Sequence, residues 1–439
     1  MKILLISRYM PPTNKIAVVR PYNFAKYLAL YGHQIVCITE KISDNDKFTN
    51  DEGFRVIYVP CGKFGRGNAK RIKTALPKYN EPQRSTVTPK KSPAIAFARR
   101  TAAQAFHVVD EYEWGRAAIS AAETIIQQAS IDLVLTTYGP LSCLLVGLKL
   151  KRDYPSIAWV SDMRDPTDSK AQQPWRRAWF AYIQKKMLRS ADAVVTVSDG
   201  LRNRYTGMLE HMGKGHTHVY TIVNGYEPGS VISEPPNDGV LRIGYMGTLY
   251  RGRSCMDALF QAIKRLDEKT GKLTSIEVHY AGNGNAEINQ QASQNGLQAH
   301  LAVHGMLSKR DSLLLQEKCD ILCVLSWNTK HEQGVLTGKF PEYIRLRRPI
   351  LTIISGELPD AELSNRNDRL HAGFSYEYGR RNDTEFTAWL SDMLKRKQAG
   401  EHFPTLFEEE AQEYAYPYLV KKLENILLKT VLETRQMQG

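Results

Sequence analysis

Two runs of alternating strand-like and helix-like segments, separated by one turn-rich stretch, most constrain how this chain can fold. In the first half, short apolar segments such as 3–6 and 131–136 alternate with segments whose apolar residues recur at helical spacing. The stretch 224–238 contains three prolines and two glycines, a composition typical of a linker. The alternation then restarts at Leu241. This order predicts an α/β protein with two doubly wound, Rossmann-like domains that face each other across a cleft.

The length of the chain supports the same division, because 439 residues exceed what one ordinary hydrophobic core can organise. We place a first domain at residues 1–225 and a second at residues 239–412. In doubly wound sheets, ligands bind beyond the carboxyl ends of the strands. The candidate functional residues should therefore lie in the loops that follow the strands.

The sequence gives no sign of export, membrane insertion or metal binding. The N-terminal apolar run is too short for a signal peptide, and no segment approaches the roughly 20 apolar residues that span a bilayer. We therefore expect a cytoplasmic protein. The six cysteines lack the spacing of a zinc site, so we expect free structural thiols, with neither disulfides nor a metal.

The positive charge of the chain is concentrated in one segment. Residues 62–101 contain eleven Lys and Arg residues and a single acidic residue, Glu81, a local net charge of +10 out of +13. Such a segment attracts phosphate groups, which predicts peripheral contact with an anionic membrane. A solvated loop without a partner is the alternative. Nucleic acid is disfavoured, because no aromatic residues are interleaved at the spacing of a known module.

The loop after the first strand contains two candidate acceptor-binding residues. Asn14 follows a pair of prolines, and Arg20 lies at the start of the next helix. Backbone amides at a helix N-terminus suit an anion or a sugar oxygen. The loop lacks the glycines of a dinucleotide-binding turn, which argues against a nicotinamide or flavin cofactor. The alternative is a stiff proline turn without a ligand.

A charged segment follows the apolar strand that ends near residue 161. Asp162, Arg164 and Asp165 are candidate catalytic residues, because carboxylates at a strand's carboxyl end could orient acceptor hydroxyls or accept a proton. Tyr138, which follows the strand at 131–136, is a further candidate on the acceptor side. The alternative is a structural Asp-Arg-Asp clamp that only fixes the loop.

In the second half, three glycine-containing turns follow successive strands. Close backbone approach combined with fixed positive charge suits a diphosphate, so these turns predict a donor site. The candidate donor-binding residues of the turns are Thr248, Arg251 and Arg253 in the first, Gly282, Asn283 and Gly284 in the second, and His304 and Gly305 in the third.

The last candidate element is a loop that leads into a helix near Gly338. Gly334 and Thr337 lie in the loop, and Lys339 and Glu342 are three positions apart, so both side chains can face one ligand. Lysine suits the phosphates, and a carboxylate suits the two vicinal hydroxyls of a ribose. The alternative is an ordinary capped helix.

Taken together, these motifs resemble the family-4 glycosyltransferases of GT-B fold. The resemblance covers nearly the whole chain and rests on the order and spacing of motifs that are individually loose. The segment 110–114 is also similar to one in members that build bacterial surface polysaccharides. The motifs are residues 2–33, 162–166, 223–225, 247–250, 281–284 and 338–343.

The resemblance implies a hexosyltransferase that acts without a metal or cofactor and retains the anomeric configuration. The second domain would bind a UDP- or GDP-linked sugar, and the first a glycan or lipid-linked acceptor. Glu342 would hold the ribose, and Arg253 and Lys339 would neutralise the leaving diphosphate. Residues 413–439 would form a crossover helix that packs back on the first domain.

Three departures from the family pattern are visible. Many members carry a glutamate eight positions before Glu342, where this chain has Gly334, so Glu332 is a possible substitute. Many also have an arginine where this chain has Thr248. Asn14 and Lys15 replace glycines of the first loop.

Three other functions stay open. They are a GT-B sugar-nucleotide epimerase, a non-catalytic subunit that binds nucleotide sugars, and a basic nucleic-acid-binding protein. His33 lies at a helix-to-strand turn, where we expect a structural role.

Overall fold

The computed structural model divides the chain into two compact units. It describes residues 1–13, 15–41, 53–61, 93–167, 172–213, 217–229, 232–250, 255–270, 275–379, 383–401, 403 and 408–437. One unit comprises residues 1–197, 202–222 and 420–439, and the other comprises residues 198–201 and 223–419. The chain therefore leaves the first unit close to the expected boundary at 225 and returns to it at Val420.

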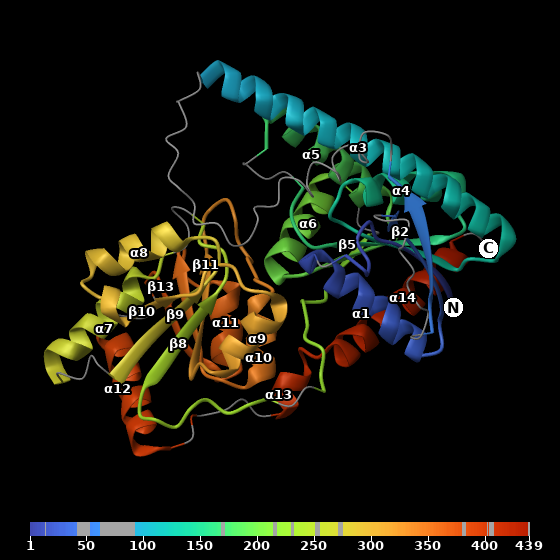
Figure 1. Cartoon of the computed structure of the whole chain (residues 1–439). Coiled ribbons are helices and arrows are strands. Elements are labelled where there is room, and N and C mark those ends of the chain that lie inside the picture. The colour runs from blue at the N-terminus through green and yellow to red at the C-terminus, as the bar shows by residue number, and fades with distance from the viewer. Residues whose placement is uncertain are drawn as a thin grey trace. The chain divides into compact units, whose positions relative to one another are not determined.

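The first unit is built on a seven-stranded parallel sheet with the strand order β3-β2-β1-β4-β5-β6-β7 (Figure 1). Its central strands are buried along their whole length, which explains why they are continuous apolar runs. The strands are β1 (Lys2–Ile6), β2 (Gln34–Lys41), β3 (Arg55–Pro60), β4 (Leu133–Thr137), β5 (Ala158–Met163), β6 (Ala193–Thr196) and β7 (His218–Thr221).

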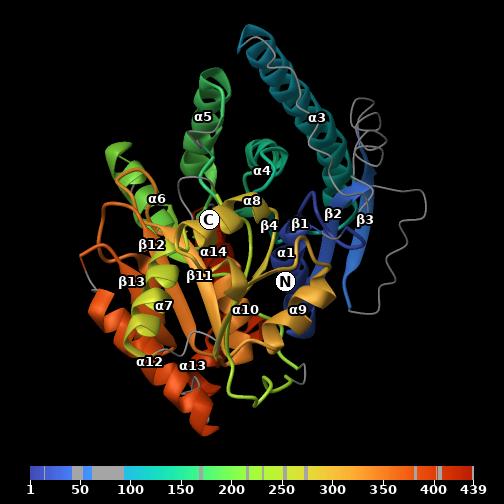
Figure 2. The same cartoon turned by 60° about the vertical axis from the view of Figure 1, so that its left-hand side comes forward.

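Helices cover both faces of this sheet. α3, α4 and α5 lie side by side on one face, with α4 in the middle (Figure 2), while α1 and the end of α14 lie on the other. α1 ends before Gly32, whose φ of 87° suits glycine. The helical elements are η1 (Ile16–Val18), α1 (Val19–Leu30), α3 (Pro93–Gln128), α4 (Ser142–Asp153), α5 (Pro174–Ser190), α6 (Asp199–His211) and α14 (Tyr416–Gln436).

The second unit contains a six-stranded parallel sheet with the order β10-β9-β8-β11-β12-β13. The strands are β8 (Leu241–Met246), β9 (Ile276–Ala281), β10 (Leu301–Val303), β11 (Ile321–Trp327), β12 (Ile350–Ser355) and β13 (Gly373–Glu377). The helical elements are α7 (Asp257–Thr270), α8 (Asn285–Gln294), η3 (Gln298–His300), α9 (Lys309–Glu317), α10 (Lys339–Leu346), α11 (Glu362–Arg369), α12 (Asp383–Ala399) and α13 (Glu408–Gln412).

Apolar residues of α7, α8 and α12 form one continuous core with the strands of the second unit. Phe260 of α7 and Phe386 of α12 are completely buried in this core, and Phe374 of β13 stacks on Phe386 with 5.3 Å between the ring centroids. The helices α9, α10 and α11 lie on the opposite side of the sheet (Figure 1). The sheet is thus covered on both faces, as all-parallel sheets require.

The end of α14 packs on the first unit, which confirms the expected C-terminal crossover helix. His33 Nε2 lies 2.8 Å from the Glu424 carboxylate, and His33 Nδ1 lies 3.1 Å from the amino group of Met1. Arg435 pairs with Asp132 at 2.5 Å. These contacts give His33 the structural role that its position in the sequence predicts.

The fold class predicted from the sequence is confirmed, and several elements were not foreseen. The helix α3 begins at Pro93, and α6, β7, α11, β13 and α12 were not predicted from the sequence. Within the described ranges, no helix combines the length and the apolar character needed to span a bilayer.

Candidate functional site

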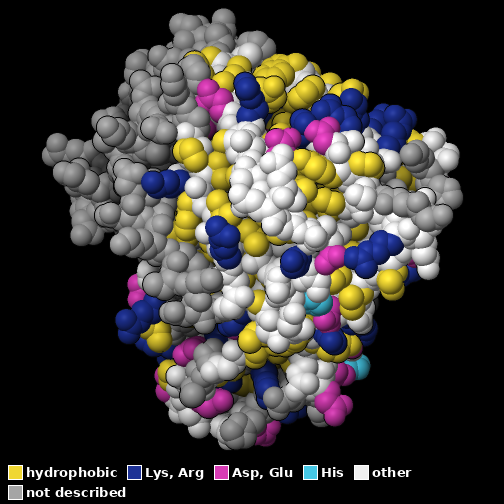
Figure 3. Space-filling view, turned by 90° about the vertical axis from the view of Figure 1, so that its right-hand side faces the viewer, with side chains coloured by type: hydrophobic (Ala, Val, Ile, Leu, Met, Phe, Trp, Pro, Cys, Tyr) yellow, Lys and Arg dark blue, Asp and Glu magenta, His cyan; other side chains and the backbone are white. Residues whose placement is uncertain are grey.

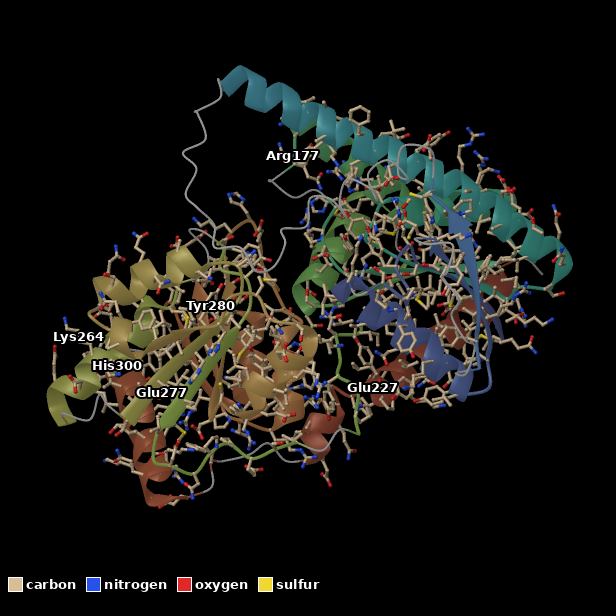
Figure 4. The ribbon with its side chains drawn as sticks, in the orientation of Figure 1. Arg177, Glu227, Lys264, Glu277, Tyr280 and His300 are labelled. Carbon is tan, nitrogen blue, oxygen red and sulfur yellow. The ribbon has the colours of Figure 1, made fainter. Side chains whose placement is uncertain are left out.

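The turns after β8, β9 and β10 are joined by backbone hydrogen bonds at the carboxyl edge of the second sheet. The N–H of Gly247 donates to the carbonyl of Ala281 at 2.9 Å, and the N–H of Gly282 donates to the carbonyl of Gly305 at 2.8 Å. The hydroxyl of Tyr280, labelled in Figure 4, donates to the carbonyl of Gly247 and accepts from the N–H of Gly284. The three predicted glycine turns therefore form one connected edge.

Close approach of neighbouring atoms explains the two glycines of the turn after β9. A Cβ atom on Gly282 would lie 2.0 Å from the carbonyl oxygen of Gly247. A Cβ atom on Gly284 would lie 2.8 Å from the Cβ of Leu249. Thr248 and Asn283 are exposed on the same turns. The edge thus presents backbone and small polar groups, which suits close approach of a diphosphate.

Lys339 and Glu342 lie together in the first turn of α10, as their spacing predicts. The ammonium of Lys339 is 3.1 Å from Oε1 of Glu342, and the two side chains are 32% and 22% exposed. The buried Gln316 of α9 donates to the same oxygen from its side-chain amide at 2.5 Å. In the described part of the chain, the recorded partners of Glu342 all contact Oε1, so Oε2 is left to accept hydrogen bonds from a ligand.

The beginning of α10 has a second feature that suits a ligand. The hydroxyl of Thr337, two residues before the helix, is buried and has no hydrogen-bond partner among the described residues. Unsatisfied buried polar atoms are rare in native proteins. The N-terminus of a helix also carries a partial positive charge. Lys339, the helix end and Thr337 therefore favour an anion at this position.

The helix α10 is fixed against the end of β8 by Tyr343. The N–H of Met246 donates to the Tyr343 hydroxyl at 3.3 Å, and Tyr343 is fully buried. Burial raises the pKa of Tyr343 well above its usual value, so the phenol remains neutral. This contact sets the position of Lys339 and Glu342 relative to the turn after β8.

Glu332, the possible substitute for the missing family glutamate, is held by an aromatic residue. The indole N–H of Trp327 donates to Oε2 of Glu332 at 2.7 Å, and Tyr250 packs edge-on against Trp327. Gly334 itself has a φ of 67°, and a Cβ atom there would lie 3.0 Å from Glu362 Oε2. A glutamate at position 334 would therefore be strained. The contact of Glu332 with a donor sugar stays a prediction.

His304, a predicted donor-binding residue, is paired with a second histidine. Its ring stacks on His279 at 5.4 Å, with His304 Nε2 lying 3.1 Å from His279 Nδ1. His279 Nε2 also lies 3.2 Å from the carboxylate of Glu277, and Figure 4 labels Glu277 on the same strand as Tyr280. Burial lowers the pKa of both histidines. The pair thus favours the uncharged form.

Arg20 and Asp162 of the first unit form a buried ion pair. Arg20 Nη2 lies 2.8 Å from Oδ1 of Asp162, and Thr137 donates to Oδ2 at 3.0 Å. Both side chains are almost completely buried. This geometry supports the structural alternative for Asp162. Direct roles of Asp162 in catalysis and of Arg20 in acceptor binding stay predictions.

Arg164 holds two backbone segments, residue 17 and residues 138–139, through three hydrogen bonds. Its guanidinium donates to the carbonyls of Tyr138, Gly139 and Ala17 at 2.8, 3.2 and 2.8 Å. Gly139 is needed there, because a Cβ atom would lie 2.7 Å from the Arg164 guanidinium. Asp165, in contrast, is exposed. Of the three predicted catalytic residues, Asp165 is the one whose position lets it reach a ligand.

Two positively charged candidates and one polar candidate lie outside the described residues. They are Arg251, Arg253 and Asn14, so their predicted roles in donor and acceptor binding stay predictions. Most of the basic segment, residues 62–92, also lies outside, and its predicted membrane contact is untested.

A charged network around Arg8 was not predicted from the sequence. Arg8 follows β1 and pairs with Glu40 at 3.0 Å and with Asp110 of α3 at 2.6 Å. Gln316 was missed as well, because a lone glutamine on an amphipathic helix carries no functional signal. Asp110 belongs to the segment 110–114, which resembles a family motif. That resemblance was the signal that could have pointed to Asp110 as a partner of Arg8.

The cysteines and the acidic residues show no metal-binding arrangement in the described ranges. All six cysteines are free thiols, and four of them are buried. No group of three or more His, Cys, Asp and Glu side chains in the described part of the chain could hold a metal ion.

Comparison with known proteins finds a family match within the first half of the chain and solved structures of the same fold. Residues 17–219 match the family described as "Glycosyl transferase 4-like domain". Sucrose-phosphate synthase from Thermosynechococcus elongatus is similar in structure, with a TM-score of 0.64, 13% identity and coverage of 98% of both chains.

Two further solved structures share this architecture. A lipopolysaccharide outer core galactosyltransferase aligns with a TM-score of 0.53 and 13% identity, over 98% of this chain and 99% of its own. A trehalose-6-phosphate protein from E. coli, solved with UDP-2-fluoro glucose bound, aligns with a TM-score of 0.60 and 12% identity, over 97% and 99%. At such identities the structural likeness shows the shared fold.

Proposed function

Because this chain is a family-4-like glycosyltransferase of GT-B fold, we propose that it transfers a sugar from a UDP- or GDP-linked donor to a glycan or lipid-linked acceptor. The transfer retains the anomeric configuration, needs no metal, and serves surface polysaccharide biosynthesis. The donor binds to the second unit at the carboxyl edge of its sheet, and the acceptor binds to the first.

One observation carries the donor site: Lys339 and Glu342 lie side by side at the start of α10, next to the unsatisfied hydroxyl of Thr337. An ammonium group and a helix N-terminus suit a diphosphate. The free oxygen of Glu342 suits the ribose hydroxyls. The bound UDP sugar in the E. coli neighbour of the same fold supports this choice of ligand.

The proposed catalysis depends on where negative charge develops as the sugar is transferred. Departure of the sugar leaves negative charge on the nucleoside diphosphate, and a preformed cation at that position lowers the barrier. We assign this role to Lys339, together with Arg253. Asp165 orients the acceptor hydroxyl, because it is the exposed carboxylate after β5. Asp162 and Arg20 hold that loop in place.

The acceptor is proposed to be lipid-linked, and the basic segment 62–101 is proposed to keep the enzyme at an anionic membrane. The concentrated charge of that segment supports this part of the proposal. The structural likeness to a galactosyltransferase of the lipopolysaccharide outer core is consistent with a surface glycan as product.

A thermal-shift panel of nucleotide sugars tests the donor site. A ligand that binds the folded protein raises its melting temperature by mass action, so the true donor should raise it most. Glu342→Ala and Lys339→Gln should abolish or strongly reduce this shift. The matched control is Asp392→Asn. It removes the ion pair between Asp392 and Arg396, which also lies within a single helix of the second unit. The control should keep the full shift.

The same proteins and nucleotide sugars also distinguish a glycosyltransferase from an epimerase. Wild-type protein incubated with its donor and no acceptor should leave the sugar unchanged, whereas an epimerase would convert it. Transfer to an acceptor should persist in EDTA. A donor shift that is equal in wild type, Glu342→Ala and Lys339→Gln would overturn the proposed site.

A further inference from the structure

The helix α5 of the first unit has one face in the core and a second face of unusual composition. Its buried side is formed by Phe180, Ile183, Gln184, Met187 and Leu188. These positions follow helical spacing and account for how α5 is anchored. The opposite face begins with three exposed aromatic residues and continues with basic ones.

The aromatic residues of this face lie at positions i, i+4 and i+7. Trp175, Trp179 and Tyr182 are 42%, 40% and 49% exposed. Trp179 and Tyr182 are neighbours, with 6.2 Å between the ring centroids. Large aromatic side chains grouped on one exposed helix face are uncommon on a protein without a binding partner there. The α5 aromatics therefore indicate a contact surface.

The charge of α5 identifies the kind of partner. The helix contains five basic residues and no acidic residue. Arg176 turns inward to Glu111, but Arg177, Lys185 and Lys186 are exposed and take part in no ion pair within the described residues. Lys186 lies over the ring of Tyr182, 4.8 Å from its centroid. The surface is therefore complementary to negative charge.

We propose that this exposed face of α5, defined by Trp175, Trp179, Tyr182, Lys185 and Lys186, binds the surface of a lipid bilayer that contains anionic headgroups. Tryptophan and tyrosine favour the interface between headgroups and acyl chains, where their rings are buried and their polar atoms stay hydrated. Lysine side chains extend along the apolar region and place their charges at the phosphates.

The packing of α5 links this surface to the predicted acceptor loop. Thr167, two residues after Asp165, donates from its hydroxyl to Gln184 of α5 at 2.9 Å and to the carbonyl of Phe180 at 3.3 Å. Both partners lie on the buried face of α5. The segment 164–167 is thus fixed to the same helix that contacts the lipid, which places a lipid-linked acceptor near Asp165. Figure 4 labels Arg177 on this helix. Figure 3 shows one face of the whole molecule, on which hydrophobic and basic side chains also occur side by side.

The inference goes beyond the proposed transfer, because it concerns a surface and not the donor site. Cosedimentation of the full chain with vesicles tests it directly. Wild type should bind vesicles that contain phosphatidylglycerol and bind pure phosphatidylcholine vesicles poorly. The binding should weaken as salt is raised, since screening shortens the range of the attraction.

Two double variants test the two parts of the surface. Lys185→Glu with Lys186→Glu should weaken binding to the anionic vesicles about 30-fold or more, given the usual contribution of each lysine near such a surface. Trp175→Ser with Trp179→Ser should also reduce binding, and on neutral vesicles it should remove what binding remains.

Each variant has a matched control. Lys264→Glu with Lys395→Glu changes the net charge equally through exposed lysines of the second unit. Leu428→Ser with Leu432→Ser removes two exposed apolar residues from α14. Both controls should bind vesicles like wild type. Melting curves with and without the donor nucleotide sugar show that each variant is folded and keeps its donor site.

Vesicle binding that is unchanged in both α5 variants, or lost equally in the controls, would overturn the proposal. So would a wild type that binds neither kind of vesicle. Light scattering tests whether a second copy of the chain occupies this surface instead. A dimer that becomes monomeric when Trp175 and Trp179 are replaced would assign the surface to that second copy. If the nucleotide sugar fails to raise the melting temperature while vesicle binding is normal, the result would instead count against the donor site.

Discussion

The buried side chain of Gln316 donates a hydrogen bond to the carboxylate of Glu342, with 2.5 Å between Nε2 and Oε1. The contact joins α9 to the first turn of α10 and fixes the carboxylate on one side. Lys339 approaches the same oxygen, at 3.1 Å. A rigid carboxylate binds a pair of ribose hydroxyls better than a mobile one, because less conformational entropy is lost.

We therefore expect Gln316→Ala to weaken donor binding about tenfold, the usual effect of losing a hydrogen bond to a charged group. Isothermal titration with the nucleotide sugar measures the change. The control is Gln291→Ala, which removes another buried amide of the same unit, one that accepts from the N–H of Met256 at 2.9 Å. That variant should lose stability and keep its donor affinity; equal affinity losses would refute a positioning role.

The ion pair between Arg20 and Asp162 leads to a prediction about stability. Asp162→Asn should lower the free energy of unfolding by about 3–5 kcal/mol, because it leaves the Arg20 guanidinium buried without a counter-charge. Denaturant titration measures this. Glu433→Gln, which removes a partly exposed partner of the exposed Lys429 on α14, should leave the midpoint unchanged. Full stability of Asp162→Asn with a loss of transfer activity would instead favour a catalytic role.

Gly282 provides a steric test of the turn after β9. Gly282→Ala should destabilise the second unit by about 3 kcal/mol or more, since its Cβ has no room and the neighbouring backbone must shift. Gly207→Ala is the matched change at a helical glycine of α6 with nothing within 4 Å. That variant should gain about 0.5–1 kcal/mol. Thermal melting of both variants checks the contrast.

The histidine pair predicts a pH dependence of stability. Burial lowers the pKa of His279 and His304 below the ordinary 6.5, so the folded state resists their protonation. The unfolded chain takes up protons first as the pH falls, and the stabilising contribution present above about pH 6.5 is lost below it. The melting temperature should therefore fall as the pH decreases from 7 to 5.

Replacing both histidines by glutamine should make this decrease smaller. His300→Gln, at a histidine that lies 3.3 Å from the carbonyl of Ile276 in the same unit, is the control and should keep the wild-type dependence. A double variant with the wild-type slope would exclude the pair as its source.

The local order of residues was sufficient to predict the two sheets and most of their elements. The strands β4 and β11 are continuous apolar runs because both faces of a parallel sheet are covered, and that pattern is visible in the sequence. Glycine at 32 and the pairing of Lys339 with Glu342 were also predictable, because both depend on neighbours within one helical turn.

Contacts between residues far apart in the sequence required the tertiary structure. From the sequence, Asp162 and Asp165 are equivalent acids that follow one strand. In the structure, Asp162 is buried against Arg20, 142 positions away, and Asp165 is exposed. Gln316 reaches Glu342 from another helix. Helical and strand periodicity record which face of an element is apolar, but the partner of a buried polar group depends on how the elements pack, and no local pattern contains that information.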